Sequence, residues 1–350
     1  MKHIKLLFVV LAGALITLSC AKTYNAKDLG DGLFARITTN RGEIIARLEY
    51  ERAPLTVCNF VALAEGRMDS VKGKRFYNGL TFHNVISLAN GDDQDFMIQS
   101  GCPIGNGFGG PGYDFPDEFN PELRHDRPGV LSMANRGIHS NGSQFFISLR
   151  SLPHLDDRYA VFGYVVHGQD IANSIIRGDT IKKVTIIRNG ESAKAFKANQ
   201  ESFNGYQVEV EKENKRKLDD QRQDEIDLIN ATYPNNNLTE SGIRYVVQKT
   251  GSGDKPKEGM LASVLYTGKL LSGKVFGDSE GVPLEFTIGK GSILRSWDEV
   301  VMDMRAGEKR IAVIPPELAY WDRDIGEGLI PPYSFLVFEM ELVSVREAAE

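Results

Sequence analysis

Hydrophobic and polar positions follow the two-residue period of β-strands in two separate parts of this chain. In the first part, the runs from Leu33 to Thr39 and from Glu43 to Leu48 flank an Asn-Arg-Gly turn, which predicts a β-hairpin. In the second part, every second residue from Leu336 to Leu342 is large and apolar, which predicts a strand with one buried face. Further short strands are expected at residues 183–188, 243–249, 261–267 and 308–314. The pattern therefore predicts two strand-rich domains.

A few segments have the spacing of helices instead. Between Pro54 and Gly66, which suit a helix start and a helix end, apolar residues recur at the i, i+3, i+4, i+7 spacing of one helix face: Val57, Phe60, Val61 and Ala64. Cys58 lies beside this stripe, so we expect an inert, buried thiol there. Shorter helices are predicted around Ile171–Ile176 and at Trp297–Met304.

A strongly charged segment separates the two strand-rich parts. Residues 209–227 contain eight acidic and five basic side chains, and pairs such as Glu211 with Lys215 stand four residues apart, as in a solvated helix. At 1.5 Å per residue, these 19 residues make a helix of about 28 Å. We expect residues 193–238 to form a charged helical linker between the domains. A simple spacer and a partner-binding helix both fit this pattern.

The first twenty residues are predicted to lie outside the fold. Lys2 and Lys5 precede an uncharged run of 13 residues, which is shorter than the roughly 20 needed to span a bilayer, so 1–19 is interpreted as a signal peptide. The run ends in Ser19-Cys20, which is similar to the acylation site of bacterial lipoproteins. We expect a lipid on Cys20, a tether over residues 20–30, and a location in the bacterial cell envelope facing the periplasm or the exterior. Ordinary secretion or an uncleaved anchor are the alternatives.

Composition fits two soluble domains and excludes several classes of protein. The chain has 350 residues, of which 41% are hydrophobic and 25% are charged. Its formal net charge of -6 gives no electrostatic footprint for nucleic acid, so we expect none as a partner. The three cysteines form no Cys-x-x-Cys pair and the six histidines have no i, i+4 spacing, so no metal site is expected. The segment Gly105–Gly110 fits the pattern G-x-G-x-x-G, but Pro111 follows where a phosphate-binding loop needs a helix.

Dense aromatic, methionine and amide sequence marks the first domain. The blocks are Phe82-His83, Phe96–Gln99, Met133–Asn135, Asn141–Phe146, Leu155 and Ala160–Gly163. In this order they resemble the cyclophilin family of peptidyl-prolyl isomerases over residues 31–192. The resemblance implies a closed antiparallel β-barrel with two capping helices and a pocket on its outer surface.

The second domain resembles a different family of the same enzyme class. Its blocks are Leu265–Gly268, Gly273–Phe276, Ile293–Trp297, Pro316–Tyr320 and Ile330–Pro332. They are similar to the FKBP family over residues 239–350, which implies an α+β fold with an antiparallel sheet wrapped on one helix. The whole chain therefore resembles a dual-family immunophilin.

Prolyl isomerisation makes modest chemical demands. Rotation about an X-Pro bond crosses a barrier near 20 kcal/mol, but it breaks no bond, so no nucleophile, metal or cofactor is expected. A catalyst needs an apolar slot for the ring and donors for the amide. In the first domain, the resemblance implies that the substrate-binding residues are His83, Phe96, Met97, Gln99, Ala134, Asn135, Gln144, Phe146, Leu155 and Tyr159.

One departure concerns catalysis in the first domain. Asn84 follows Phe82-His83 at the position where the family has a catalytic arginine. An amide can still donate a hydrogen bond, but it lacks the charge, and the loss of one charge-assisted donor can cost about 100-fold in rate. Arg136 is interpreted either as a substitute cation or as a solvated surface residue. The extra acidic residues from Leu88 to Gln94 are expected to adjoin the pocket.

The second domain keeps more of its family pattern. The resemblance implies an apolar cup with Trp297 as its floor, and further substrate-binding positions at Phe276, Phe286, Ile293, Leu294, Leu329 and Phe338. Tyr266, Asp278 and Tyr320 are the catalytic candidates. The carboxylate of the family pocket is either lost at Gly277 or supplied by Asp278 after a shift of one residue.

These features predict a monomeric isomerase that assists the folding of exported proteins by acting on proline-containing unfolded or extended chains. Catalysis is expected mainly in the FKBP-like half, with the cyclophilin-like half weak or limited to binding. The alternative is a non-catalytic holdase or adaptor in which both pockets only bind prolyl segments.

Overall fold

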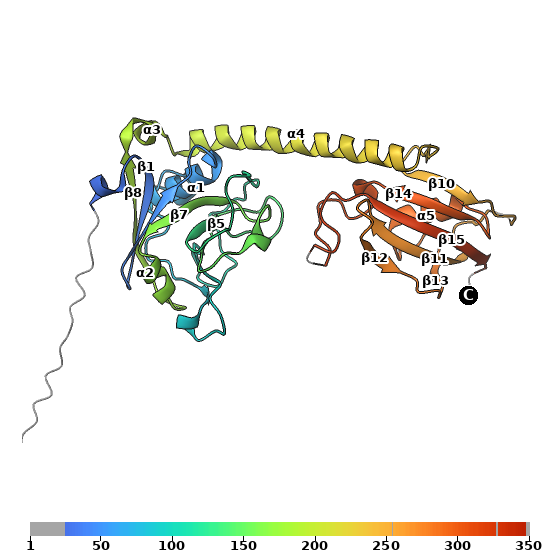
Figure 1. Cartoon of the computed structure of the whole chain (residues 1–350), viewed down its shortest axis with the longest axis horizontal. Coiled ribbons are helices and arrows are strands. Elements are labelled where there is room, and N and C mark those ends of the chain that lie inside the picture. The colour runs from blue at the N-terminus through green and yellow to red at the C-terminus, as the bar shows by residue number, and fades with distance from the viewer. Residues whose placement is uncertain (1–24, 254, 327, 348–350) are drawn as a thin grey trace, which may run out of the picture.

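The computed structural model describes residues 25–253, 255–326 and 328–347 as two sheet-based domains that are bridged by one long helix (Figure 1). The predicted signal peptide and Cys20 lie outside the described residues. Among those that are described, no helix is both long and apolar enough to cross a bilayer. Five short 3₁₀ helices lie in the connections: Ala26–Leu29, Asp69–Val71, Leu88–Asn90, Pro153–Leu155 and Pro316–Leu318.

The first domain is built on an eight-stranded antiparallel sheet in the order β3-β4-β6-β5-β7-β2-β1-β8. The strands are β1 (Gly32–Thr39), β2 (Glu43–Leu48), β3 (Asn84–Ile86), β4 (Met97–Ser100), β5 (Val130–Met133), β6 (Phe145–Ser148), β7 (Val161–His167) and β8 (Ile181–Asn189). The predicted hairpin is confirmed, since β1 pairs with β2 in register from Leu33↔Leu48 to Thr38↔Glu43.

The predicted closed barrel is not confirmed, because the sheet curls but its ladder ends at β3 and β8. Among the described residues, these two edges meet through an isolated bridge between Thr81 and Thr180 and through bonds beside it, such as Phe82 N–H to the Asp179 carbonyl at 2.8 Å. β3 has only three residues before the chain turns away at Ser87, so it is too short to pair along β8.

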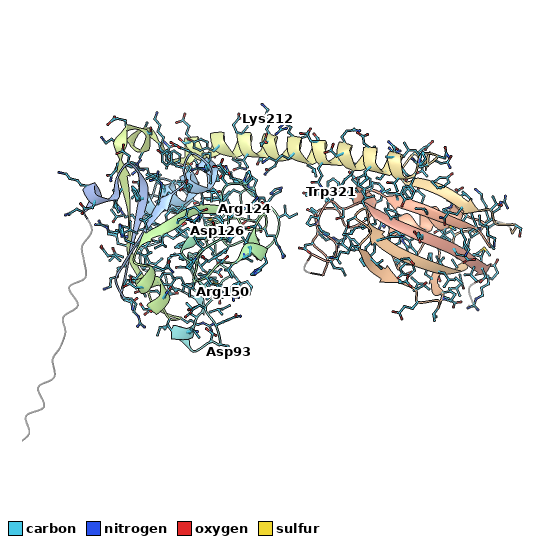
Figure 2. The ribbon with its side chains drawn as sticks, viewed as in Figure 1. Asp93, Arg124, Asp126, Arg150, Lys212 and Trp321 are labelled. Atoms are coloured by element: carbon cyan, nitrogen blue, oxygen red, sulfur yellow. The ribbon has the colours of Figure 1, made fainter. Side chains whose placement is uncertain are left out.

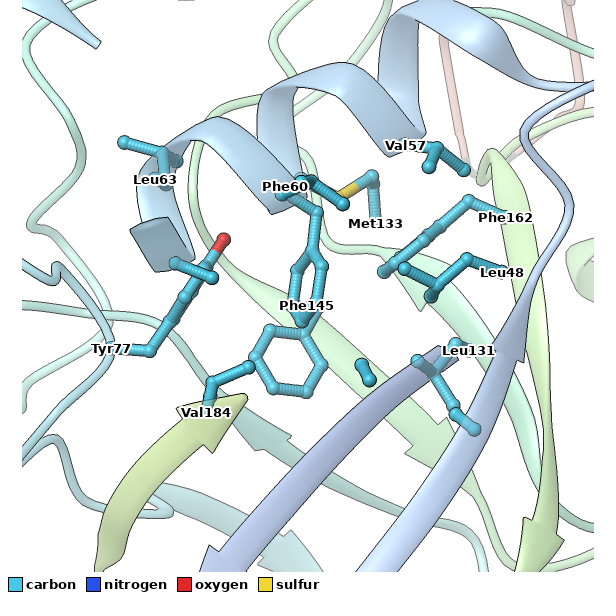
Figure 3. Close-up of a cluster of buried hydrophobic side chains, with 14 of the residues drawn as sticks. Leu48, Val57, Phe60, Leu63, Tyr77, Leu131, Met133, Phe145, Phe162 and Val184 are labelled. Carbon is cyan, nitrogen blue, oxygen red and sulfur yellow. The ribbon is translucent and has the colours of Figure 1, made fainter. Parts of the chain in front are cut away.

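Helix α1 (Pro54–Glu65) packs across this sheet and carries much of the first core (Figure 3). The Phe60 ring meets the Phe145 ring edge-on at 5.4 Å between centroids. All ten residues from Leu55 to Ala64 are buried, so the helix is covered on every side and not on one face as its pattern predicted. Gly66 ends the helix with φ of 76°, where a Cβ atom would lie 2.6 Å from the Gly73 carbonyl oxygen.

Cys58 lies on the covered side of α1, where burial raises the pKa of its thiol to about 12. Its Sγ lies 3.8 Å from the Asn199 carbonyl oxygen at the start of the linker. The prediction of a buried thiol is confirmed. Two short helices complete this part of the chain, α2 (Gln169–Ser174), as predicted, and α3 (Gly190–Ala195).

The linker is a single helix, α4 (Gln200–Thr232), whose 33 residues span about 50 Å. It is longer than the charged run predicts because apolar side chains extend it at both ends. Phe203 packs on Tyr113 and Phe115 in the first domain, and Ile229 joins a small cluster on the second. Both ends of α4 are therefore anchored in a core, while most of the charged side chains in its middle are exposed.

The second domain is a seven-stranded antiparallel sheet in the order β12-β11-β15-β14-β10-β9, with β13 also pairing β11. The strands are β9 (Asn237–Leu238), β10 (Arg244–Lys249), β11 (Leu261–Leu270), β12 (Val275–Asp278), β13 (Leu284–Thr287), β14 (Lys309–Ile314) and β15 (Leu336–Arg346). Helix α5 (Arg295–Asp303) buries Trp297, Val300 and Val301 against the sheet. The predicted combination of one helix and an antiparallel sheet is confirmed.

Candidate functional site

Three adjacent strands place the polar and apolar candidates of the first domain in one row. Asn84 on β3 lies opposite Gln99 on β4, and Gln99 lies opposite Phe146 on β6. Directly opposed residues of antiparallel strands point to the same side of the sheet. Asn84, Gln99 and Phe146 therefore lie on the same surface of the sheet. The sequence assigned them to a hydrogen-bond donor, a peptide-binding amide and the proline slot.

The amides of this surface form a chain of hydrogen bonds. Asn84 Nδ2 donates to Gln99 Oε1 at 3.0 Å, and Gln99 Nε2 donates to Gln144 Oε1 at 2.9 Å. Gln144 Nε2 in turn donates to the carbonyl oxygens of Gly107 and Gly109 at 2.7 and 2.9 Å. These neutral amides hold one another in place, and Asn84 contacts Gln99 where the family arginine was expected.

The apolar candidates lie beside this amide chain. Met97 and Phe146 are 8% and 5% exposed, so the floor of the slot is largely closed to water. The Tyr159 ring meets the Phe146 ring edge-on, at 5.8 Å between centroids. The Tyr159 N–H donates to the Leu155 carbonyl, so a single turn of chain joins these two predicted substrate-binding residues. Phe96 stacks on the exposed His154 ring at 6.1 Å. The predicted slot is thus assembled from β4, β6 and the segment that follows Pro153–Leu155.

A histidine that sequence analysis did not single out supports Phe146 from behind. His125 is fully buried, and its ring stacks on the Phe146 ring at 5.9 Å between centroids. Its Nδ1 lies 2.8 Å from Asp156 Oδ1. Burial lowers the pKa of His125, although the neighbouring carboxylate opposes this shift. No spacing signal connects residues 125 and 146, so only the fold reveals the stack. Burial likewise lowers the pKa of His83.

A cavity of about 320 Å³ adjoins the slot. Four of the predicted substrate-binding residues line it: Gln99, Ala134, Asn135 and Gln144. Another part of the wall is the glycine-rich segment Gly105–Gly110, which fitted the pattern of a phosphate-binding loop. Here its carbonyl oxygens accept hydrogen bonds from the Gln144 side chain. Gly107 can take this path because its φ of 87° is unfavourable for other residues.

Arg136 lies at this cavity and not over the proline slot. Its Nη2 pairs with the Asp114 carboxylate at 3.1 Å, and both side chains are well exposed. Because this exposed arginine already forms an ion pair with a carboxylate, the structure does not favour its interpretation as a substitute for the catalytic arginine. Asn135 Nδ2 is also engaged, donating to the Arg158 carbonyl at 2.8 Å.

The acidic insertion folds on itself and away from the cavity. Asp92 accepts the Ser87 N–H, and Asp95 accepts the Leu88 N–H, each at 2.9 Å. Asn90 Oδ1 accepts the Arg177 N–H at 3.0 Å, which attaches the loop to the segment before β8. No residue from 87 to 95 is among the described residues that line the cavity, so the loop does not adjoin the pocket on that side.

The second site is a cluster of five aromatic rings. The Tyr266 and Phe338 rings meet the Trp297 ring edge-on at 4.9 and 5.1 Å. Phe286 lies 6.0 Å from Trp297, and Phe276 lies 5.7 Å from Phe338. Trp297 is 2% exposed, and its indole N–H has no hydrogen-bond partner among the described residues. The aromatic residues that were predicted to line an apolar cup therefore cluster around Trp297.

The remaining candidates of this site lie around its edge. Ile293, Leu294 and Tyr320 are partly buried against the second core, while Leu329 is 38% exposed. The Arg323 guanidinium stands 5.8 Å from the centre of the Tyr320 ring. Of these candidates, Leu294 contacts the tryptophan directly, because the Trp297 backbone N–H donates to the Leu294 carbonyl at 2.9 Å.

Asp278 does not face the cup. It is exposed, and its carboxylate accepts hydrogen bonds from the Thr267 hydroxyl and the Glu280 N–H, which lower its pKa. Thr267 follows Tyr266 on the same strand, and successive side chains of a strand point to opposite faces. Gly277 pairs with Gly268 instead, and a Cβ atom on Gly277 would lie 3.7 Å from the Tyr266 hydroxyl. The placement of Asp278 as a pocket carboxylate is therefore corrected.

Comparisons with known proteins agree with both sites. The model of the cyclophilin-type peptidyl-prolyl cis-trans isomerases matches residues 34–222, which is more than half of the chain. The chain belongs to this family. The model of the FKBP-type peptidyl-prolyl cis-trans isomerases matches residues 253–343. The resemblance to both families is thus confirmed, and the chain carries two isomerase domains in the predicted order.

Individual relatives match one domain at a time. Peptidyl-prolyl cis-trans isomerase A of Mycobacterium tuberculosis is 48% identical over 142 residues, which are 39% of this chain and 74% of that protein. Peptidyl-prolyl cis-trans isomerase of Helicobacter pylori is 40% identical over 167 residues, which are 47% of this chain and 93% of that protein. A cyclophilin-type isomerase crystal structure from Cryptosporidium parvum covers 45% of this chain and 98% of its own, at 34% identity and a TM-score of 0.38.

Proposed function

We propose that this chain is a lipid-anchored peptidyl-prolyl isomerase that assists the folding of exported proteins, with most of the catalysis in the FKBP-type domain. The single observation that carries the assignment of catalysis is the ring cluster around Trp297, which is 2% exposed at the floor of an apolar cup. A planar prolyl amide is strongly hydrated, whereas the twisted amide has less charge separation. A cup that excludes water therefore favours the twisted form.

The first domain offers donors of a weaker kind. Asn84 and Gln99 are neutral amides that already hydrogen-bond to each other. A neutral donor is roughly half as strong as a charged one toward the prolyl nitrogen, whose lone pair localises as the amide twists. We therefore assign this domain to binding of prolyl segments, with slow turnover.

A matched pair of variants in the full chain tests this division. Phe146→Leu and Trp297→Leu each replace a buried aromatic side chain with leucine, one in each domain. We expect Trp297→Leu to remove most of the isomerisation rate on a short prolyl peptide and Phe146→Leu to leave most of it. Thermal unfolding of both variants checks that each domain remains folded. The opposite ranking would move catalysis to the first domain.

The second candidate function is a holdase or adaptor that binds prolyl chains without turning them over. Gly277, which has no side chain beside the Tyr266 ring, and the neutral amide of Asn84 favour it, since neither residue presents a charged group to the prolyl amide. The wild-type chain separates the two functions: binding of prolyl peptides with no acceleration of cis/trans exchange would establish the holdase.

The proposed location rests on the sequence before residue 25. We expect the mature protein to begin at Cys20 with acyl chains on that residue, and several chains give durable anchoring where one alone is marginal. Intact-mass spectrometry of the protein from membranes, with Cys20→Ser as the control, measures the cleavage and the added lipid. A protein of unmodified mass in the soluble fraction would replace anchoring with secretion.

A further inference from the structure

Helix α4 contacts both domains through side chains on neighbouring turns. Asn214 Nδ2 donates to the backbone carbonyl of Asp117 in the first domain at 2.7 Å. One turn later, Leu218 lines a small crevice with Trp321, Tyr333 and Phe335 of the second domain. Four residues of helix cover only about 6 Å. The two domains are therefore held by adjacent turns of one continuous helix, with no flexible segment between the two attachments.

On the second domain, the α4 contacts fall on the loop that carries the pocket residue Tyr320. Arg222 forms an ion pair with Glu317, just before Tyr320. Trp321, just after it, adopts φ of 56°, which is uncommon for a bulky residue, and its ring meets the Tyr333 ring edge-on at 5.6 Å. The strained residue is therefore packed against α4 at the edge of the second site, so the helix positions the wall of that site as well as the domain.

The rims of the two sites also touch each other. Arg158 Nη2 lies 3.3 Å from Asp324 Oδ2. Arg158 belongs to the rim of the first slot, because it precedes Tyr159 and its carbonyl accepts the Asn135 amide. Asp324 belongs to the loop between Tyr320 and Leu329, and its Oδ1 accepts the Gly328 N–H. Figure 2 shows Trp321 on the edge of the second domain that faces the first.

We propose that the preferred substrate is a single unfolded chain that carries two prolines and occupies both sites at once, an inference that rests on the proposed function of each site. α4 contacts both domains, and the rims of the two sites meet at Arg158 and Asp324, so the two sites lie at adjoining edges of the domains. A chain held in one site then meets the other at high effective concentration, which multiplies affinity without any new contact. A fixed helix makes this gain depend on the number of residues between the two prolines.

Binding of labelled peptides to the full chain measures this directly. The probes carry one Leu-Pro unit, or two units separated by Gly-Ser spacers of about 2 to about 24 residues, since an extended residue reaches at most about 3.5 Å. We expect the best two-proline peptide to bind at least about 10-fold tighter than the one-proline peptide, with a clear optimum of spacer length. A gain of about twofold at every spacing, as expected for two independent sites, would overturn the proposal.

A hinge in α4 supplies the second arm of the experiment. Lys217→Gly with Asp219→Gly loosens the turn between the two attachments, and Lys217→Ala with Asp219→Ala is the matched control that keeps the helix. Both residues are exposed and lie in neither site. We expect the glycine pair to lower, several-fold, the largest affinity ratio of two-proline to one-proline peptides, and to broaden its optimum of spacer length. The alanine pair should leave both the ratio and the optimum unchanged. Equal behaviour of the two pairs would contradict the role of α4.

The one-proline peptide distinguishes failure of this inference from failure of the proposed function. Exchange measured on that peptide by NMR reports whether the sites catalyse at all. Catalysis together with a spacing-independent affinity overturns the two-site substrate and leaves the isomerase intact. Absence of both catalysis and binding removes the proposed function, and the two-site substrate with it.

Discussion

The two sites of this chain differ in how each is built to meet a prolyl amide. The first presents a row of neutral amides, from Asn84 through Gln99 to Gln144, beside a slot floored by Phe146. The second presents rings around Trp297 and, beside the Tyr266 ring, Gly277 with no side chain. One site therefore depends on oriented donors and the other on exclusion of water.

On the proposed function, this difference predicts which property of each site limits its rate. Donors stabilise the transition state only as far as their charge and reach allow, so the first site is limited by the residue at position 84. A cup without charged groups is limited by how completely its rings displace water, so the second site is limited by its floor. Changes to charge and changes to ring size should then separate the two sites.

The largest expected effect is a gain in the first site. Asn84→Arg places a cation beside Gln99 Oε1, which already accepts from residue 84. We expect kcat/KM of this site to rise about 100-fold, because a charge-assisted donor then reaches the amide. NMR exchange on a prolyl peptide measures it in a chain that also carries Trp297→Leu, so that the second site is silent.

Asn84→Gln is the control for this gain. It lengthens the side chain without adding charge, and we expect it to change the rate less than threefold, since it remains a neutral donor. If glutamine raised the rate as much as arginine, reach and not charge would limit the first site.

A smaller loss is expected from a change of ring size in the second site. Trp297→Phe keeps an aromatic floor but shortens it, and one edge-on ring contact is worth about 0.5 to 1.5 kcal/mol. We expect kcat/KM on a prolyl peptide to fall about 10-fold. The melting temperature should change little, because the variant also removes a buried N–H that has no partner among the described residues.

Trp321→Phe is the matched control, because Trp297 and Trp321 are the two tryptophans of the sequence. Trp321 is 45% exposed and lies at the α4 crevice, outside the ring cluster. Its substitution should leave the rate on a short peptide within about twofold, as is usual for changes outside a site. A melting temperature that falls in parallel with the rate of Trp297→Phe would indicate a structural role for Trp297 instead.

The two sites were predictable from the sequence to different degrees. The aromatic residues of the second cup carry a family pattern and assemble as that pattern implies. In the first site, the sequence identified Asn84 as unusual but could not show that its amide is bonded to Gln99, because a contact across 15 residues depends on strand register. The His125 stack under Phe146 had no sequence signal for the same reason.

The linker and the sheet edges illustrate further limits of prediction. Charge patterning located the middle of α4, but its ends are set by Phe203 and Ile229, whose burial depends on surfaces that other parts of the chain provide. The closed barrel followed from the resemblance alone, whereas the short β3 leaves the ladder open. Asp278 was misplaced because one inserted glycine reverses the face to which the next side chain points.

A pH effect should separate the two domains, because the second domain contains no histidine. In the unfolded chain, His125 takes up a proton near pH 6.5, whereas burial lowers its pKa in the folded domain. Between these two pKa values the unfolded state binds more protons, so the free energy of unfolding falls as the pH drops below about 6.5. We expect the thermal transition of the first domain to shift down between pH 7.5 and pH 5.5 more than that of the second.

His125→Gln tests the origin of this shift. The variant cannot titrate, so the pH-dependent part of the shift should shrink, although His83 contributes in the same direction and a remainder is expected. The variant also loses the ring stack on Phe146, so the comparison is made on the difference between the two pH values and not on the melting temperature itself. An undiminished shift in the variant would assign the pH dependence to other groups.

The smallest expected effect on the rate comes from substitution of Asp278. This residue could have given the second site a polar group for the prolyl amide, as the first site has. A carboxylate in the cup would give the second site a charged group, but this one is exposed and bonded to Thr267 on the face opposite Tyr266. Asp278→Asn keeps the shape and an acceptor for Thr267, so we expect kcat/KM on a prolyl peptide to change less than twofold and the stability by about 0.5 kcal/mol or less. A rate loss of 10-fold or more at unchanged stability would place the carboxylate in the reaction, and the second site would then depend on charge as the first does.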